Sequence, residues 1–256
     1  MMNPILKQIV ESGYVKTPNG ECIKVHSAIS PEEGQSLQTL ISQFKPTLTL
    51  EIGLSYGISA LYICDVLEKK PDTRHIVIDP NQYGGLWGDA WEGIGIHNLR
   101  EAGYESIIEF LNIPSYQALP QLEKEGRKID FAFIDGWHTF DYALVDFFYI
   151  DKMLRVGGIV VFHDADWESI HKLCRYISTN LSYSLITNLD TKKVKVSMKR
   201  RILDKVIRIQ RFSKFYERCF NPELVTSNFA LGLSGTLVAF RKNSEDTRKW
   251  DFHRVF

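Results

Sequence analysis

Residues 47–59 read TLTLEIGLSYGIS, a run of β-branched and apolar residues followed by a turn with two glycines and an apolar helix start. Residues 47–52 predict a strand, and residues 58–67 have the apolar periodicity of a helix. Gly53 and Gly57 permit positive φ and a close approach of the backbone to a ligand. In open parallel sheets, ligands bind beyond the carboxyl ends of the strands. The stretch therefore predicts a strand, turn and helix that together hold a cofactor.

The chain that follows alternates short β-branched runs with longer helical patterns. We expect further strands at 75–78, 106–111, 129–134 and 159–162, and helices at 87–102, 115–125 and 140–154. Gly157 and Gly158 are expected to separate the last of these helices from the last strand. Strands that alternate with helices of this length predict an α/β fold with a parallel sheet and right-handed crossovers.

Two further segments flank this core. Ser30-Pro31-Glu32-Glu33 combines a serine N-cap, a proline at the first helical position and a glutamate three residues after the cap, so it predicts a helix to about Phe44. Residues 227–233 and 235–240 predict a closing antiparallel pair of strands. We interpret the chain as one domain: 1–45 is a helical preface or lid, 46–186 the cofactor-binding core, 187–226 a basic helical insertion, and 227–256 the closing hairpin and tail.

Composition and charge are those of an ordinary globular protein. Of 256 residues, 44% are hydrophobic and 24% charged, which argues against disorder. The 31 basic and 31 acidic residues balance, so the net charge gives no reason to expect a nucleic-acid partner. The four cysteines form no CxxC pair and the N-terminus lacks the apolar core of a secretion signal, so we expect a reducing compartment and a cytoplasmic protein.

The turn after the first strand favours one kind of cofactor. Its spacing, Gly53-x-Ser55-x-Gly57, differs from the GxGxxG of dinucleotide folds. Glu51 in front of the turn would repel a pyrophosphate but could accept a hydrogen bond from an ammonium group. Asp79, after the second strand, has two acceptor oxygens for the two hydroxyls of a ribose, although Asp79-Pro80 could also simply start a turn. Together these residues favour a cationic amino-acid cofactor over a nicotinamide dinucleotide.

Acidic residues and histidines follow the fourth and fifth strands. Asp135 ends one strand, and His163 and Asp164 end the next, so the three side chains should converge on a divalent cation. The alternative is that Asp164 caps the helix that begins near Trp167. His138 has an ordinary pKa of about 6.5, which suits a base that takes a proton from a hydroxyl, although it could also be a helix cap or a loop histidine.

Four stretches carry a family resemblance: LEIGLSYGIS, IVIDP, IDFAFIDGWH and GGIVVFHDAD. They resemble the class I S-adenosylmethionine-dependent methyltransferases, and more closely the metal-dependent O-methyltransferase branch that includes catechol and bacterial sugar O-methyltransferases. The resemblance covers residues 29–166 and implies a Rossmann-like, seven-stranded, mostly parallel sheet with an antiparallel last strand and helices on both faces. It implies that the cofactor contacts Glu51, Gly53, Ser55, Gly57, Ser59, Asp79, Ser115 and Asp135, with Ser59 near the methionine carboxylate, Asp79 on the ribose and Ser115 beside the adenine.

The end of the fifth strand departs from the family pattern. Metal-dependent members end this strand in Asp-Asn or Glu-Asp, whereas here Ala165 follows Asp164 and His163 stands where a glutamate would be. Imidazole suits Mn, Fe or Zn better than Mg. We expect Mg or Mn on Asp135 and Asp164, with His163 as a third ligand and Asp166 as an outside candidate.

The segment 192–218 is strongly basic, with eleven lysines or arginines against two acids. Its apolar residues recur at helical spacing, which predicts a basic amphipathic helix. Three interpretations stay open: a helix packed on the body with a solvated face, a lid or a contact in a homo-oligomer, and a surface for an anionic membrane or glycan.

These observations predict an S-adenosylmethionine-dependent O-methyltransferase that acts on a hydroxyl of a small molecule, with a sugar among the candidates. His138 would take the proton, and a cation on Asp135 and Asp164 would position and acidify the hydroxyl. Three alternatives remain: an N-methyltransferase without a metal, a nicotinamide-dependent oxidoreductase, and a non-catalytic protein that binds S-adenosylmethionine.

Overall fold

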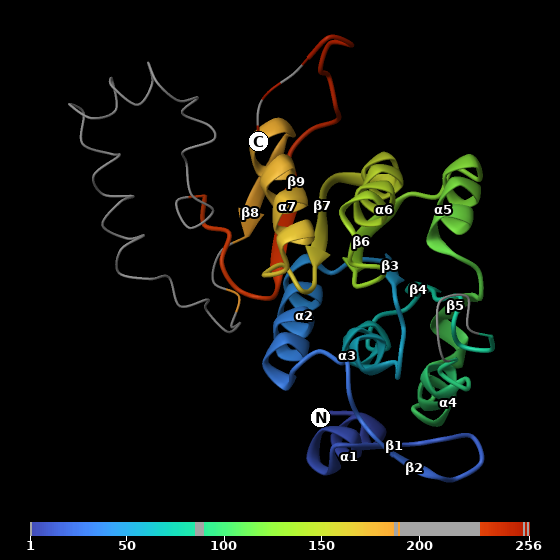
Figure 1. The fold of residues 1–256 in the computed structure, drawn as a ribbon. Coiled ribbons are helices and arrows are strands. Elements are labelled where there is room, and N and C mark those ends of the chain that lie inside the picture. The colour runs from blue at the N-terminus through green and yellow to red at the C-terminus, as the bar shows by residue number, and fades with distance from the viewer. Residues whose placement is uncertain (1, 85–89, 187–188, 190–230, 253, 255) are drawn as a thin grey trace, which may run out of the picture.

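The computed structural model describes residues 2–84, 90–186, 189, 231–252, 254 and 256 (Figure 1). The N-terminal part holds α1 (Pro4–Ser12), β1 (Tyr14–Lys16), β2 (Cys22–Lys24) and α2 (Pro31–Phe44). The core continues with β3 (Leu48–Ile52), α3 (Ile58–Leu67), β4 (Arg74–Ile78), α4 (Ile94–Glu101), a 3-10 helix (Glu105–Ile107), β5 (Ile108–Leu111), α5 (Ser115–Lys124), β6 (Ile129–Ile134), α6 (Phe140–Met153), β7 (Leu154–Phe162), α7 (Glu168–Asn180), β8 (Tyr183–Ile186) and β9 (Val238–Lys242).

The main sheet has seven strands in the order β5-β4-β3-β6-β7-β9-β8. The first five of these strands run parallel, and β9 lies antiparallel to both β7 and β8. From β3 the chain builds one side of the sheet through β4 and β5 and then crosses to the other side at β6, so the strand order reverses beside β3. Ligands bind at such reversals in open α/β sheets. The predicted seven-stranded sheet with an antiparallel last strand is confirmed.

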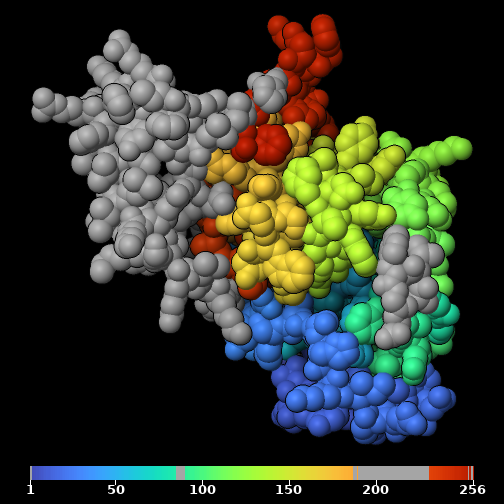
Figure 2. Space-filling view, in the orientation of Figure 1, coloured from blue at the N-terminus to red at the C-terminus, as the bar shows by residue number. Residues whose placement is uncertain are grey.

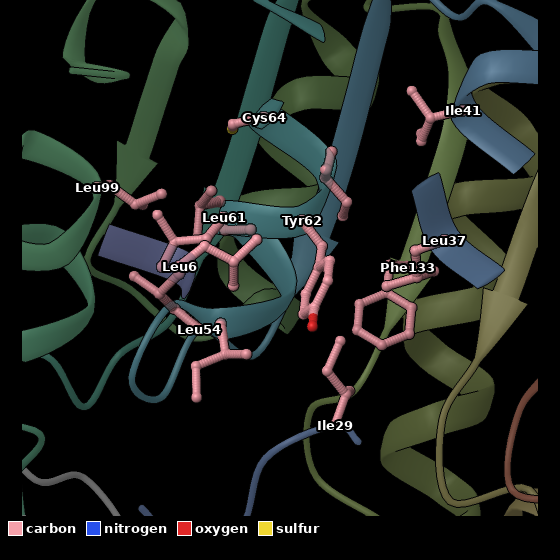
Figure 3. Close-up of a cluster of buried hydrophobic side chains, with 14 of the residues drawn as sticks. Leu6, Ile29, Leu37, Ile41, Leu54, Leu61, Tyr62, Cys64, Leu99 and Phe133 are labelled. Carbon is pink, nitrogen blue, oxygen red and sulfur yellow. The ribbon is translucent and has the colours of Figure 1, made fainter. Parts of the chain in front are cut away.

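Each face of the sheet carries its own hydrophobic layer, because alternate residues of a strand point to opposite faces. Val77 and Phe133 join the layer under α1, α2, α3 and α4, whereas Ile76 and Ile134 join the layer with α5, α6 and α7. Figure 3 shows part of the first layer, in which Tyr62 lies beside Phe133. Helices therefore cover both faces, as predicted.

The predicted capping box at the start of α2 is present. The backbone N–H of Glu33 donates to the Ser30 hydroxyl at 3.3 Å, and the Ser30 N–H donates to the Glu33 carboxylate at 2.8 Å. One turn into the helix, a side chain at Gly34 would overlap the ring of Tyr62 on α3. The cap fixes where α2 begins, and the glycine lets it pack closely on α3.

Two predicted boundaries differ from the structure. The helix expected at 87–102 begins only at Ile94, because the preceding residues bond to the loop after β4, with the Trp91 N–H donating to the Asn81 carbonyl at 2.7 Å; residues 87–89 lie outside the described part. β7 starts at Leu154 and runs through the glycine pair, since its parallel pairing with β6 continues across it with a register irregularity.

The predicted closing hairpin is wrong in its pairing. β9 does not pair with the segment just before it but inserts between β7 and β8, with Val238 opposite Phe162 and Ala239 opposite Ile186. Residues 231–237 form turns, and the beginning of the other predicted strand, 227–230, lies outside the described residues. The hairpin of β1 and β2 was not predicted; its short strands are largely exposed and show little alternation.

The basic segment 192–218 lies outside the residues that the structure describes, so its predicted helix stays a prediction. Among the helices that are described, none combines the length and the apolar character needed to cross a membrane.

Candidate active site

A cavity of about 860 Å³ lies at the carboxyl ends of β3, β4, β6 and β7. Its volume is in the range of small-molecule and cofactor sites. In Figure 2 the blue N-terminal segment meets the yellow-green and gold segments of α6 and α7 on the side facing the viewer. Every predicted site residue except Glu51 and Gly57 lines the cavity: Gly53, Ser55, Ser59, Asp79, Ser115, Asp135, His138, His163 and Asp164.

The turn after β3 requires its two glycines. Gly53 has φ +90°, and a Cβ there would overlap the backbone carbonyl oxygen of Asp135. Gly57 has φ +77° and would place a Cβ 2.8 Å from the Gly95 carbonyl oxygen. Because both obstacles are backbone atoms, neither can turn away as a side chain could. Gly57 therefore supports the turn by its packing rather than by lining the cavity.

Asp79 holds the turn in place from the end of β4. One carboxylate oxygen accepts from the backbone N–H groups of Leu54 and Ser55 at 2.9 and 3.0 Å, and the other accepts from the Asn81 N–H at 2.8 Å. The last of these bonds is the turn that Asp79-Pro80 was expected to start. Asp79 also lines the cavity, so its predicted contact with a ribose is compatible with the structure and stays a prediction.

Glu51 differs from its prediction. Its carboxylate is fully buried and accepts from the Ser59 hydroxyl and from Nε2 of His75, the latter at 3.0 Å. Burial raises the pKa of Glu51, against the opposing effect of these partners. The side chain lies in the layer beneath α3 rather than along the cavity, so in this structure it supports Ser59.

The residues after β6 and β7 meet in one cluster. Nε2 of His138 lies 3.0 Å from Asp164 and 3.5 Å from Asp135, and Nδ1 of His163 lies 3.0 Å from Asp135. The four residues each offer one ligand atom, and these atoms all lie within 4.8 Å of one another. The predicted convergence of two carboxylates and a histidine is therefore present, with His138 as a fourth member.

A comparison with known families identifies the core of the chain. Residues 50–165 match a family described as a methyltransferase domain. This part of the chain is a methyltransferase domain. The matched region begins within β3 and ends just after β7, so it includes the turn, Asp79 and the cluster at Asp135. The predicted family, the class I S-adenosylmethionine-dependent methyltransferases, is confirmed.

Two curated relatives of the methyltransferase domain are named as caffeoyl-CoA O-methyltransferases. The caffeoyl-CoA O-methyltransferase of Stellaria longipes is 28% identical over 141 residues, which cover 54% of this chain and 54% of the relative. The caffeoyl-CoA O-methyltransferase 2 of Petunia hybrida is 28% identical over 145 residues, with the same coverage of both chains. The chain thus spans about half the length of the curated relatives it matches.

Solved structures agree on the fold. An O-methyltransferase from Bacillus cereus, solved in complex with S-adenosylhomocysteine, superposes with a TM-score of 0.58 at 16% identity, covering 85% of this chain and 84% of that one. The O-methyltransferase TomG from Streptomyces achromogenes, solved with S-adenosylmethionine, gives a TM-score of 0.57 at 16% identity, covering 86% and 84%.

The carboxylates of the cluster favour the charged forms of its two histidines, His138 and His163. Burial alone would lower the pKa of His138, but hydrogen bonds and charge from Asp135 and Asp164 outweigh it and raise that pKa to about 9. Asp135 and Glu33 act in the same way on His163, whose pKa rises to about 10. In this arrangement His138 therefore carries a proton near neutral pH, and its role as the base stays a prediction.

The donor set of the cluster fits a divalent transition metal. The carboxylates of Asp135 and Asp164 and the imidazole of His163 offer ligand atoms that lie within 4.8 Å of one another. The protons on the imidazoles balance the carboxylate charge in this arrangement, and a bound cation would balance it in the same way. Imidazole donors favour Mn, Fe or Zn over Mg, which prefers oxygen ligands. The expected magnesium is thus less well matched than manganese. Asp166 is not part of the cluster.

Several residues of the site were not predicted. His26, Tyr56 and Trp91 form an aromatic wall of the cavity, with the Tyr56 hydroxyl 2.7 Å from Nε2 of His26. Trp137 and Trp167 line the cavity beside His138, and both are about half exposed. Tyr56 lies within the glycine turn itself, which was the available signal.

Asp146 of α6 was also missed, and it lies behind the cavity. It is 1% exposed, and its carboxyl bonds to Ser115, the residue expected beside the adenine. Burial raises the pKa of Asp146 to about 7, although the bond to Ser115 opposes the rise. The carboxyl is therefore largely protonated in mildly acidic solution and charged in alkaline solution.

Asp146→Asn is expected to flatten the pH dependence of stability. An unfolded aspartate titrates near pH 3.9, so the folded protein holds a proton that the unfolded chain has lost, and the free energy of unfolding falls as pH rises toward 7. Between pH 5 and 8 this fall amounts to about 3 kcal/mol, which the variant should not show. Urea denaturation at both pH values measures it. Asp141→Asn, on the exposed side of the same helix, is the matched control; an identical pH profile for all three proteins would contradict the assignment.

Proposed function

We propose that this methyltransferase domain transfers the methyl group of S-adenosylmethionine to a hydroxyl of a small molecule, with a divalent cation held by Asp135 and Asp164. The observation that carries the proposal is that one cavity joins the glycine turn and Asp79 to the cluster of carboxylates and imidazoles. The first part can hold a nucleoside cofactor, and the second can bind and deprotonate an acceptor. The names of the curated relatives support oxygen as the methyl acceptor.

The cofactor would lie along the turn after β3. Ser55 and Ser59 line the cavity there and offer hydroxyls to the amino-acid part, while Asp79 faces the ribose region and Ser115 the base. The cofactor supplies an electrophilic methyl group on a positively charged sulfur. Asp135, at the end of β6, lies between this region and the histidines, so its charge favours a sulfonium nearby.

His138 would accept the proton of the acceptor hydroxyl at Nε2. In the structure that atom faces Asp164 and Asp135, which keep it protonated. A divalent cation on these carboxylates would lower the pKa of an adjacent hydroxyl and would also remove the charge that raises the pKa of His138. His138 then becomes neutral near physiological pH and can act as a general base.

The acceptor is proposed as a hydroxyl on a flat or sugar-like small molecule. Trp137 and Trp167 stand at the cavity beside the reacting cluster, where they can stack on either a phenol or a sugar ring. The one argument for an anionic glycan or membrane surface as a partner is the positive charge of the basic segment 192–218.

Calorimetry tests the cofactor. S-adenosylhomocysteine is expected to bind the full chain with one-site stoichiometry, whereas NAD⁺ should give no binding heat because the turn lacks the pyrophosphate fingerprint. Binding of NAD⁺ in place of S-adenosylhomocysteine would establish the oxidoreductase alternative.

Transfer of a labelled methyl group then tests the reaction. Diphenols and sugars are offered with Mn²⁺ present and again with a chelator. Chelation should abolish O-methylation, and added Mn²⁺ should restore it. Full activity in the chelator would remove the cation from the mechanism, and methylation of amines alone would favour the N-methyltransferase alternative.

A further inference from the structure

Glu33, the capping glutamate of α2, also reaches the reacting cluster. It is 6% exposed, and one carboxylate oxygen accepts from the Ser30 N–H and hydroxyl at 2.8 and 2.9 Å and lies 3.5 Å from Nε2 of His163. Its other oxygen accepts from the hydroxyl of Thr236, just before β9. A single buried carboxylate thus joins the start of α2, the end of β7 and the segment that leads into β9.

The ring of His163 lies between two sets of carboxylates. Nε2 faces Glu33, while Nδ1 lies 3.0 Å from Asp135 and 3.8 Å from Asp164. An imidazole that binds a cation through one nitrogen needs a proton on the other, and a carboxylate behind it fixes that choice. Glu33 is in the position of this second carboxylate.

We propose that Glu33 is a positioning residue of the active site, which holds Nε2–H of His163 so that Nδ1 faces the Asp135–Asp164 pair and can bind a divalent cation. The inference rests on the cation-binding part of the proposed function and is independent of the methyl acceptor.

Helix capping alone does not account for the arrangement. In a capping box the side chain at Glu33 needs only to accept from the Ser30 N–H, and glutamine serves there as well as glutamate. The contacts with His163 and Thr236 are additional, and they come from segments far away in the chain. Glu33→Gln therefore preserves the cap and the size of the side chain while it removes the charge that faces His163.

Titration of the full chain with Mn²⁺, followed by the electron paramagnetic resonance signal of the free ion, tests the proposal. Glu33→Gln is expected to weaken Mn²⁺ binding by 10- to 100-fold, the usual effect of losing such a partner. Glu32→Gln removes the same charge from an exposed neighbour on the same helical turn and should leave Mn²⁺ affinity unchanged. Calorimetry with S-adenosylhomocysteine should give equal binding for all three proteins.

A measurement on the unaltered protein covers the case in which Glu33→Gln does not fold. In ¹⁵N spectra, addition of Zn²⁺ should shift Nδ1 of His163 while Nε2 keeps its proton, with the signals assigned by their loss in His163→Gln. Equal Mn²⁺ affinity in the wild type and Glu33→Gln, or Zn²⁺ on Nε2, would overturn the positioning role and leave the proposed function intact. Absence of metal binding in the wild type would overturn both the positioning role and the cation, while S-adenosylhomocysteine binding would still support a methyltransferase.

Discussion

His138→Ala is expected to lower methyl-transfer turnover by about 10²- to 10⁴-fold, the range over which a positioned acid or base contributes. His138 lines the cavity, and its Nε2 is held between Asp135 and Asp164, where an acceptor hydroxyl would lie next to a cation. Loss of the imidazole leaves only water to take the proton. Single-turnover assays with labelled S-adenosylmethionine measure the effect, and calorimetry should show that S-adenosylhomocysteine still binds.

His97→Ala is the matched control for this experiment, because His97 is a half-buried histidine on α4 that does not line the cavity. It should retain wild-type turnover. If His138→Ala also retains it, another group takes the proton. A large loss of S-adenosylhomocysteine affinity in His138→Ala would instead assign the residue to cofactor binding.

Gly53→Ala is expected to lower the free energy of unfolding by at least about 3 kcal/mol, from left-handed strain of 1–2 kcal/mol and the cost of forcing a methyl group against fixed backbone. The obstacle is the carbonyl oxygen of Asp135, so relief of the clash must push β3 and β6 apart at the cofactor turn. We expect S-adenosylhomocysteine binding to be lost as well. Urea denaturation and calorimetry measure the two effects.

The variant Gly20→Ala measures the cost of left-handed backbone strain without a steric clash. Gly20 has φ +88°, nearly the same as Gly53, but no heavy atom lies within 4 Å of where its Cβ would be. This variant should lose only about 1–2 kcal/mol. Equal losses in the two variants would mean that the contact between the turn and Asp135 contributes little.

The strands and helices whose sequences show a regular pattern of apolar residues could be predicted from the sequence. Strands buried on both faces have continuous apolar runs, and their carboxyl ends meet at one edge of the sheet. The sequence therefore predicts Asp79, Asp135 and Asp164 at that edge, where all three line the cavity. The position of β9 could not be predicted in this way. Short loops favour hairpins between neighbouring segments, whereas β9 pairs with β7 and β8 across long separations.

The direction of Glu51 was predictable in principle. It pairs in register with Val77 and Phe133, whose side chains belong to the layer under α3, and the alternation of a strand places Glu51 on that same face.

The electrostatic interactions and the contacts between distant segments could not be predicted from the sequence. The raised pKa of His138 depends on two carboxylates from different strand ends, which shift it only at the distances that the fold sets. Likewise, the sequence marked Glu33 only as a capping residue, because its contact with Thr236 joins residues 203 positions apart.

The place of β9 sets an order for biosynthesis. Because β9 lies between β7 and β8, neither of these strands has its partner in the described sheet on that side until residues 238–242 have left the ribosome. Thr236 arrives with β9, so the Glu33 carboxylate also gains its last hydrogen bond at that moment. A nascent chain that stalls before residue 236 would therefore have a formed glycine turn but an incomplete active site, and the edge of β7 would be unpaired. We expect such incomplete chains to aggregate or to be degraded rather than to be partly active.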